Sequence, residues 1–589
     1  MRRSFSLLCV LLAACGQEPP AVQPIGSGAS VASLAERSAD YSPRVQAITE
    51  NVWIAIGYGL ANSILIEGED GLIVIDTMET LDAGRTVARA FRQISDKPLK
   101  AIIYTHNHAD HVFGAQAYIE ELAPVGASVD VIAHASTAAL VHRVVSEFRP
   151  IVTARSLRMF GSALDDAGFV NNGIGPRLTI EANSQFGFVK PTQVFDERLQ
   201  LSIAGVAVEL IHAPGETDDQ LFVWLPEQGV LCPGDNIYQA FPNLYTIRGT
   251  PFRSLKQWAA SIDAMRALPV RHLLPSHTLP LAGEQAIRQV LTDYRDAIRY
   301  VRDQSIRWIN AGLTPDEIVE RLQLPPHLAA SPWLQEHYGS VRWSARAVFA
   351  GNLGWFDGNP STLDPLPPRT QAEKMAQLAG SVDALSAQLV AAQDAQEWQW
   401  ALQLSDHLLR LRPDDAAARQ IRIEALIALG EASSNPNARH YYLMSARELR
   451  DGLRLTPLQQ GSESTLRSLP MVTILEALSV NLRAEEVLDT VQRVGFSFPD
   501  IGEDWTLTIR RGVTELQPGL ASHLDIHAHV DSLIFKQLLG RQINGPLAIA
   551  RDFDFPKGNG AAFARFLLLF QPVRAAPEPA PLAALAGEQ

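Results

Sequence analysis

The sequence predicts an α/β fold for the first half of the chain, on three observations. Short apolar runs rich in β-branched residues, such as 52–56, 63–66 and 72–76, are separated by glycine-containing turns and indicate strands. Two longer stretches, 81–95 and 136–148, have the length and pattern of helices. Carboxylate or imidazole side chains directly follow several of the strands. Strands covered by helices, with polar groups at the strand ends, make a layered α/β domain.

Composition limits the class of protein. The 589 residues are too many for one hydrophobic core, so about three domains are expected. A hydrophobic content of 47% and a charged content of 19% are typical of globular proteins. The net charge of −14 argues against nucleic-acid binding. The only cysteines are Cys9, Cys15 and Cys232, too few for a disulfide scaffold.

The N-terminus has the pattern of a secretory signal. Arg2 and Arg3 precede a short apolar run, and small residues then lead to Cys15. Residues 1–14 resemble a bacterial lipoprotein signal peptide, in which the cysteine becomes the lipidated first residue. The alternative is an ordinary cleaved signal with a cysteine there by chance. Residues 15–40 have the composition of a tether. A lipoprotein of the bacterial envelope, facing the periplasm and attached through an N-terminal lipid, is expected.

A histidine-rich segment follows the strand expected at 101–104. His106, His108, Asp110 and His111 place four metal-capable side chains within six positions. This spacing does not fit one face of a helix, but a tight loop can aim the four groups at two neighbouring points. The alternative is a polar surface turn. Neutral imidazole and carboxylate are the usual ligands of catalytic zinc, so the segment predicts a metal site.

Three further metal-capable residues each come just beyond a strand. Glu216 follows the strand at 206–211, Asp235 follows a short strand ending near Cys232, and His277 ends the strand at 271–277. Taken singly, each is an ordinary turn or cap residue. Taken together with the histidine-rich segment, they predict one composite site. His134 and His212 are interpreted as packing residues or as residues that orient the ligands.

The order H-x-H-x-D-H, P-G-E-T, G-D and S-H resembles that of the metallo-β-lactamase superfamily. Glutamate in the second motif is similar to the alkyl sulfatase branch, whose members degrade dodecyl sulfate. The segments N-L-Y-T-I-R-G at 243–249 and L-G-W-F-D-G-N-P at 353–360 also resemble this branch. The resemblance implies an αββα sandwich, then an all-helical dimerisation domain and a C-terminal α+β domain like a sterol carrier protein.

The resemblance also implies a dinuclear zinc site. One ion would be held by His106, His108 and Glu216, the other by Asp110, His111 and His277, and Asp235 would bridge them. Zinc is favoured over iron or manganese on ligand type alone. The family has glutamate at the bridging position, and the shorter Asp235 can change the distance between the metals. Asp110, Asp235 and Arg248 are the expected catalytic residues.

The expected substrate is an amphiphilic alkyl sulfate ester, hydrolysed to alcohol and inorganic sulfate by metal-activated water. Arg248 and Arg253 would form the fork that binds and stabilises the sulfate. The segment 159–175 resembles the family's substrate loop, but Phe160 and Ser162 replace a tyrosine and an asparagine there. The residues expected to bind substrate are Ser162, Gly175, Asn243, Tyr245, Arg248 and Arg253.

The expected domains are the catalytic domain at 41–300, the helical domain at 301–455 and the sterol-carrier-like domain at 461–572. A disordered tail is expected at 573–589. The helical domain implies a homodimer. Two alternatives stay open: another ester hydrolase of the envelope on the same architecture, favoured by Asp235 and the altered substrate loop, and a non-catalytic lipid-binding lipoprotein.

Overall fold

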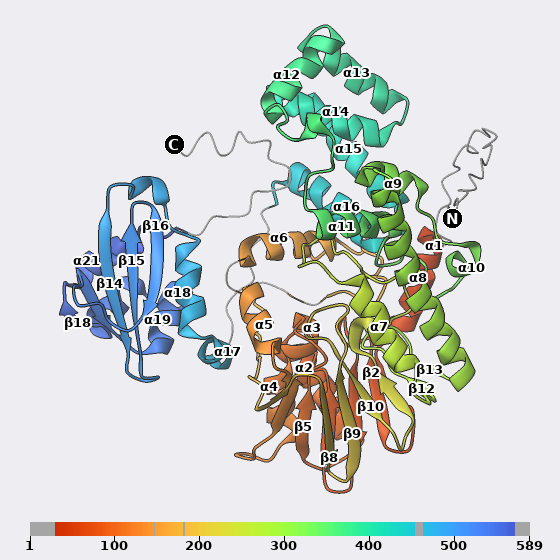
Figure 1. Ribbon diagram of the computed structural model, residues 1–589, viewed down its shortest axis with the longest axis vertical. Helices are drawn as coiled ribbons and strands as arrows, with labels where there is room; N and C mark the ends of the chain where they lie inside the picture. Colours follow the sequence, from red (N-terminus) through yellow and green to blue (C-terminus); the bar gives the residue numbers. More distant parts are fainter. Residues whose placement is uncertain (1–29, 146–147, 179, 181–182, 454–462, 572–589) are drawn as a thin grey trace, which may run out of the picture.

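The computed structural model describes residues 30–145, 148–178, 180, 183–453 and 463–571 (Figure 1). The first sheet has seven strands in sequence order, antiparallel from β1 to β4 and parallel from β4 to β7. Its strands are β1 (Arg44–Ala47), β2 (Val52–Ile56), β3 (Ser63–Glu67), β4 (Leu72–Ile75), β5 (Leu99–Ile103), β6 (Asp130–His134) and β7 (Gln193–Phe195).

The second sheet has six strands in the order β13-β12-β11-β10-β9-β8, and only the β11–β12 pair is parallel. Its strands are β8 (Arg198–Ile203), β9 (Val206–His212), β10 (Leu221–Leu225), β11 (Val230–Cys232), β12 (His272–Leu273) and β13 (Leu281–Ala282). The strand expected at 271–277 is therefore much shorter, and His277 lies in the loop beyond it.

The two sheets pack face to face, and helices cover both outer faces. Ile73 and Ile103 of the first sheet share a core with Val223 of the second, while Val74 and Ile102 face the helices on the other side. Strands buried on both faces need the continuous apolar runs seen in the sequence. The predicted αββα sandwich is confirmed. Its helices are α2 (Leu81–Arg92), α3 (Ala109–Val112), α4 (Ala115–Leu122), α5 (Thr137–Val145), α6 (Arg149–Met159), α7 (Leu255–Arg266) and α8 (Glu284–Asn310).

The helical region follows without a break at the boundary expected at residue 300, because α8 runs through it and packs on α7. Thr314 and Glu317 form a capping box that starts the next helix. Helices α12 to α15 make a core of their own, at the top of Figure 1. The helices are α9 (Pro315–Arg321), α10 (Pro326–Ala329), α11 (Val341–Leu353), α12 (Pro368–Ala379), α13 (Val382–Asp394), α14 (Trp398–Leu411), α15 (Ala416–Ala432) and α16 (Pro436–Asp451).

The C-terminal domain is a five-stranded sheet, order β16-β15-β14-β17-β18, with helices, and lies beside the sandwich in blue (Figure 1). Phenylalanines dominate its core. The predicted α+β character is confirmed. Its elements are α17 (Glu463–Ser468), α18 (Met471–Ser479), β14 (Val491–Phe498), β15 (Glu503–Arg510), β16 (Val513–Pro518), β17 (Ile526–His529), α19 (Ser532–Leu539), α20 (Gly545–Arg551), β18 (Asp554–Lys557) and α21 (Gly560–Leu567).

The expected signal peptide, Cys15 and most of the tether lie outside the described residues, as does the expected C-terminal tail. The described part of the tether includes a short helix, α1 (Val31–Glu36), capped by Ser30. Of the helices in the described ranges, none combines the length and the apolar character that a membrane span requires.

Candidate metal and anion site

The histidine-rich segment leaves β5 as a short loop that is held by Asp76. Asp76 follows β4, and its carboxylate accepts hydrogen bonds from the backbone N–H and hydroxyl of Thr105 at 2.9 and 2.8 Å. The segment was expected to be a tight loop, but its last two ligands, Asp110 and His111, lie in the single turn α3. These two side chains therefore leave the backbone from a helix and the two earlier histidines from a loop.

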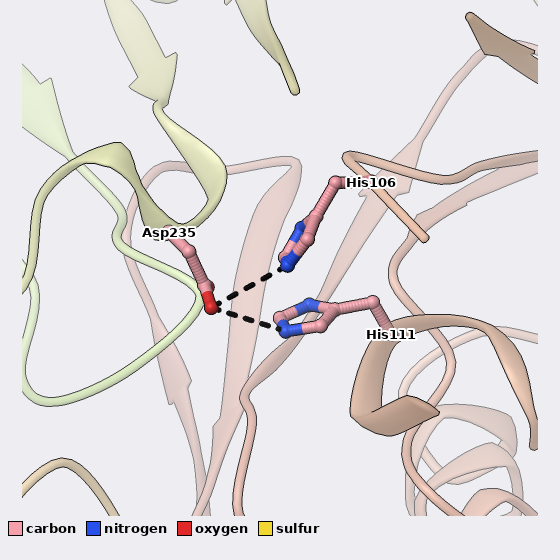
Figure 2. A group of neighbouring side chains, drawn as sticks. All are labelled: His106, His111 and Asp235. Carbon is pink, nitrogen blue, oxygen red and sulfur yellow. Dashed lines mark ion pairs between the residues drawn. The ribbon is translucent and has the colours of Figure 1, made fainter. Parts of the chain in front are cut away.

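His106, His111 and Asp235 meet at one point (Figure 2). Oδ2 of Asp235 lies 3.6 Å from Nε2 of His106 and 3.5 Å from Nε2 of His111. All three are at least 90% buried. The strand β11 delivers Asp235 from the second sheet, whereas both histidines come from the end of the first.

A second group consists of Asp110, His111 and His277. Oδ2 of Asp110 lies 3.4 Å from the Nε2 atoms of both His111 and His277. Nε2 of His277 is also 3.2 Å from Oδ2 of Asp235. The other ring nitrogen of His277 donates to the carbonyl of Leu60 at 2.8 Å, which fixes the orientation of the ring.

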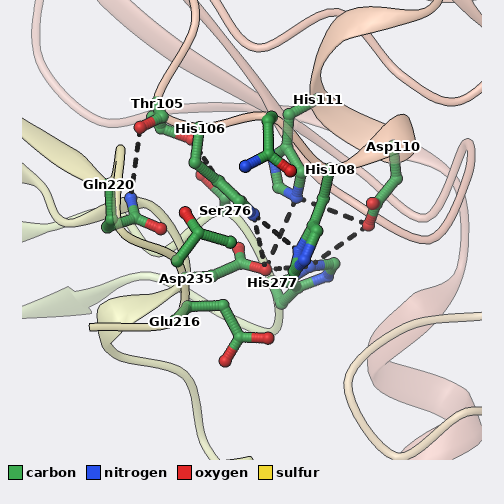
Figure 3. Close-up of polar contacts among 12 residues, drawn as sticks. Thr105, His106, His108, Asp110, His111, Glu216, Gln220, Asp235, Ser276 and His277 are labelled. Atoms are coloured by element: carbon green, nitrogen blue, oxygen red, sulfur yellow. Dashed lines mark hydrogen bonds and ion pairs between the residues drawn. The ribbon is translucent and has the colours of Figure 1, made fainter. Parts of the chain in front are cut away.

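A third group consists of His108, Glu216 and Asp235, with one ligand atom of each within 4.8 Å of the others. Asp235 and His111 each belong to two of the three groups. Figure 3 draws the whole cluster. The structure brings all seven predicted ligands together: His106, His108, Asp110, His111, Glu216, Asp235 and His277.

The protonation states of the cluster follow from burial and mutual charge. Burial lowers the pKa of His106 to about 3, so its imidazole is neutral, the form that binds a metal. Burial also lowers the pKa of His111, but neighbouring carboxylates, Asp235 foremost, raise it well above its ordinary value. Burial raises the pKa of Glu216 to about 7 against the opposing effect of Arg253.

The donor set fits a divalent cation. Nε2 of His111, Oε2 of Glu216 and Oδ1 of Asp235 are buried within the cluster and have no hydrogen-bond partner among the described residues. Buried polar atoms without partners are rare in proteins, and three of them within one cluster of metal-capable residues need a cation or solvent there. Imidazole and carboxylate ligands suit zinc and similar divalent ions.

Two arginines lie at the edge of the cluster. Nη2 of Arg248 is 3.0 Å from Nε2 of His108, and Nη1 of Arg253 is 2.7 Å from Oε1 of Glu216. Arg253 is buried and also donates to the carbonyl of Asn243. Its Nε and Nη2 atoms are buried without a partner among the described residues. Cationic groups beside the cluster can receive an anion, and Arg253 in addition orients a predicted ligand.

The other predicted substrate residues make no hydrogen bond to the ligand cluster within the described ranges. Asn243 is buried, and its backbone N–H donates to the hydroxyl of Tyr238 at 2.7 Å. Tyr245 is half-buried and makes no hydrogen bond to the ligand cluster within the described ranges. Gly175 packs against the backbone of Leu60, where a Cβ atom would lie 2.3 Å from the carbonyl oxygen. The hydroxyl of Ser162 is buried without a partner among the described residues.

Asp219 is a functional candidate that the sequence prediction missed. It is fully buried, and its carboxylate accepts from Asn107, Thr137 and Thr217, each at 2.7 Å. It thereby joins the histidine-rich loop to the loop that carries Glu216. No local pattern marks this role, since the three donors come from separate segments. Asp76 was also missed, although the strand-end rule that found the ligands applies to it.

His134 and His212 lie outside the three ligand groups. Their rings stack with centroids 4.0 Å apart, and Nε2 of His212 donates to the carbonyl of Asp218 at 2.7 Å. In the C-terminal domain, Nε2 of His527 is 2.9 Å from the hydroxyl of Ser497, and neither His527 nor His529 belongs to a candidate metal group in the described ranges.

Two family models match the chain. Residues 56–277 match the metallo-beta-lactamase superfamily, and residues 314–452 match the alkyl sulfatase dimerisation domain. The first covers most of the sandwich, from the end of β2 to beyond β12, and all seven predicted ligands. The second covers α9 to α16. The prediction that this helical region is a dimerisation domain of the alkyl sulfatase type is therefore confirmed.

Individual relatives extend the likeness over nearly the whole chain. A linear primary-alkylsulfatase of a Pseudomonas species is 40% identical over 500 residues, which is 82% of this chain and 92% of that protein. An (R)-specific secondary-alkylsulfatase of Pseudomonas is 29% identical over 87% of this chain and 78% of its own length. The solved structure of the stereoselective inverting sec-alkylsulfatase Pisa1 from Pseudomonas superimposes with a TM-score of 0.84, at 26% identity over 93% of this chain and 87% of that one. The chain therefore belongs to the alkylsulfatases of the metallo-beta-lactamase superfamily.

Proposed function

We propose that this protein is a metal-dependent alkylsulfatase that hydrolyses linear alkyl sulfate esters, such as dodecyl sulfate, to the alcohol and inorganic sulfate. One observation carries the proposal: seven candidate ligands, five buried and two half-buried, lie together beside two arginines, in a chain 40% identical to a linear primary-alkylsulfatase. A sulfate monoester carries a full negative charge, and this edge of the cluster offers two guanidinium groups to receive it.

The resident metals are proposed to be two zinc ions. His106, His108 and Glu216 would hold one, Asp110, His111 and His277 the other, and Asp235 would lie between them. When bound, such a pair supplies Lewis acidity and a water-derived nucleophile near neutral pH. Asp235 and Asp110 would also contribute negative charge to the site and serve as proton acceptors in the reaction.

Arg248 is proposed to bind the sulfate group and to stabilise the charge that develops as the C–O or S–O bond breaks. The neighbouring His108 is neutral, because burial holds its pKa well below the ordinary value. The positive charge of Arg248 therefore remains available to bind the substrate. Inorganic sulfate is a good leaving group, and two preorganised cations beside it reduce the need for a general acid. Arg253 is proposed to contribute through its two unpaired nitrogens while holding Glu216.

The assembly and the location are part of the proposal. The match to the alkyl sulfatase dimerisation domain supports a homodimer. Lipidation of Cys15 would place the enzyme on the periplasmic side of a bacterial envelope membrane, where amphiphilic sulfate esters partition. Palmitate labelling of the wild type and of Cys15→Ser in the native host tests this placement, and equal labelling of both would contradict it.

The function itself is tested by measuring metal content and turnover on one purified sample. We expect about two zinc ions per chain, release of sulfate from dodecyl sulfate, and loss of activity on chelation that zinc restores. Dodecyl phosphate, a thioester and a β-lactam serve as comparison substrates. Preferential hydrolysis of any of these, or lipid binding without turnover, would overturn the proposal. Hydrolysis in ¹⁸O-enriched water distinguishes the two sites of attack. Attack at carbon places the label in the alcohol, and attack at sulfur places it in the sulfate.

A further inference from the structure

A buried ion pair joins the dimerisation domain to the catalytic domain behind the anion site. Arg158, near the end of α6, meets Glu448 of α16 in a two-pronged contact: Nε to Oε1 at 2.7 Å and Nη2 to Oε2 at 3.0 Å. Arg158 is 2% exposed and Glu448 5%. A buried, bidentate arginine–carboxylate pair has a fixed geometry, so it determines where α6 lies relative to α16.

The same helix holds the loop that carries Arg248. Nη2 of Arg155, one turn before Arg158, donates to the carbonyl of Ile247 at 2.6 Å. The sulfur of Met159 accepts from the hydroxyl of Thr246 at 3.3 Å. Two contacts from α6 thus fix the two residues that immediately precede Arg248, whose guanidinium lies 3.0 Å from His108.

Helix α16 also supports the segment just beyond α6. Gly161 has φ +62°, and a Cβ atom added there would lie 2.9 Å from the ring of His440. The ring of His440 stacks on Phe169, with centroids 4.8 Å apart. The segment that resembles the family's substrate loop therefore rests on the dimerisation domain at Gly161 and Phe169, and on the sandwich at Gly175, which packs against Leu60.

We propose that Glu448 is a positioning residue for the anion site: through Arg158 it fixes α6, and α6 holds the loop that presents Arg248 to the sulfate group. Glu448 belongs to none of the three candidate metal groups among the described residues. This role rests on the proposed function, because it acts on the group assigned to sulfate binding.

The test is a double-mutant cycle between Glu448 and Arg248, with 1-octanesulfonate as a non-hydrolysable probe. Glu448→Gln keeps the side chain's shape and removes its charge. In the metal-loaded dimer we expect it to weaken octanesulfonate binding about tenfold and to lower kcat/KM for octyl sulfate, with metal content and dimer mass unchanged. In the Arg248→Ala background, the same change should weaken binding by no more than about twofold.

Asp451→Asn is the matched control, because it removes a carboxylate from the same helix where Asp451 pairs with Arg447 and Arg450 near the surface. A purely structural role of Glu448 would weaken binding equally in both backgrounds and would overturn the inference, as would wild-type affinity in Glu448→Gln. Should Glu448→Gln not purify as a folded dimer, Glu448→Asp is taken through the same cycle. Wild-type protein that does not hydrolyse octyl sulfate would overturn the proposed function instead.

Discussion

Oδ2 of Asp76 accepts a hydrogen bond from Nδ1 of His111 at 2.7 Å, and both side chains are completely buried. A carboxylate only accepts, so this contact leaves Nε2 of His111 as the nitrogen that faces the ligand cluster. The same oxygen accepts from the hydroxyls of Thr105 and Ser276, each at 2.8 Å. Thr105 and Ser276 directly precede two other predicted ligands, so one carboxylate fixes the approach of three histidines.

Asp76→Asn should lower metal affinity without unfolding the protein. Asparagine has the same size and tolerates the left-handed backbone at this position, where φ is 59°. Its side chain has one accepting oxygen instead of two, so it cannot accept from both the backbone N–H of Thr105 and the ring of His111, and the ring is held less firmly. We expect metal affinity to fall about 10- to 100-fold, measured by competition with a chromogenic chelator. Asp70→Asn, an exposed carboxylate in the preceding turn, is the control, and equal affinity in the two variants would contradict the role of Asp76.

The residue patterns predicted a layered α/β domain and one composite ligand site because both depend on local rules, whereas the two-sheet sandwich was implied by the family resemblance. Strands buried on both faces require uninterrupted apolar runs, and ligands such as Glu216 and Asp235 come directly after such strands. The ends of neighbouring strands meet in space, so residues far apart in the chain could be expected in one site. The same rule could have found Asp76, which follows the buried strand β4.

The contacts that orient the ligands could not be predicted in this way. Asp219 gathers donors from three segments, and Arg158 meets a carboxylate 290 positions later in the chain. No periodicity or motif records which distant side chain satisfies a buried charge, since only the tertiary fold brings the two together. Arg253 is an example. The motif predicted that its side chain binds the sulfate group, and the structure shows that it also forms an ion pair with Glu216.

Arg248→Ala should separate substrate binding from metal binding. The side chain approaches His108 but belongs to none of the three ligand groups, so zinc content should stay at the wild-type value. Loss of one charge-assisted contact to sulfate should lower kcat/KM for dodecyl sulfate about 100-fold, about 2.7 kcal/mol of transition-state stabilisation. Steady-state kinetics and metal analysis on the same sample measure both quantities. Normal hydrolysis by this variant would show that Arg248 does not bind the sulfate.

Asp219→Ala should disconnect the two ligand loops. Removal of the carboxylate leaves the hydroxyl of Thr137 buried without its acceptor, which costs about 1–3 kcal/mol, and takes the acceptor from the half-buried Asn107. We expect a lower melting temperature and weaker metal binding together, measured by calorimetry with and without zinc. The neighbouring Asp218→Ala is the matched control because Asp218 is exposed. Equal melting temperatures of Asp219→Ala and Asp218→Ala would contradict the role of this contact.

His440 should make the protein less stable as the pH falls below neutrality. The ring is completely buried, and burial lowers its pKa to about 3. The unfolded chain binds a proton below its ordinary pKa of about 6.5, whereas the folded protein does not until about pH 3. The stabilisation from the neutral ring is therefore complete above about pH 6.5 and is lost between that pH and 3, by up to about 1.4 kcal/mol for each pH unit.

His440→Phe keeps an aromatic ring on Phe169 but cannot titrate. Its free energy of unfolding in guanidinium, measured from pH 7 to pH 5, should fall less steeply than that of the wild type, with exposed His523→Gln as the control for changing a histidine. Parallel pH profiles of the wild type and His440→Phe would exclude this contribution.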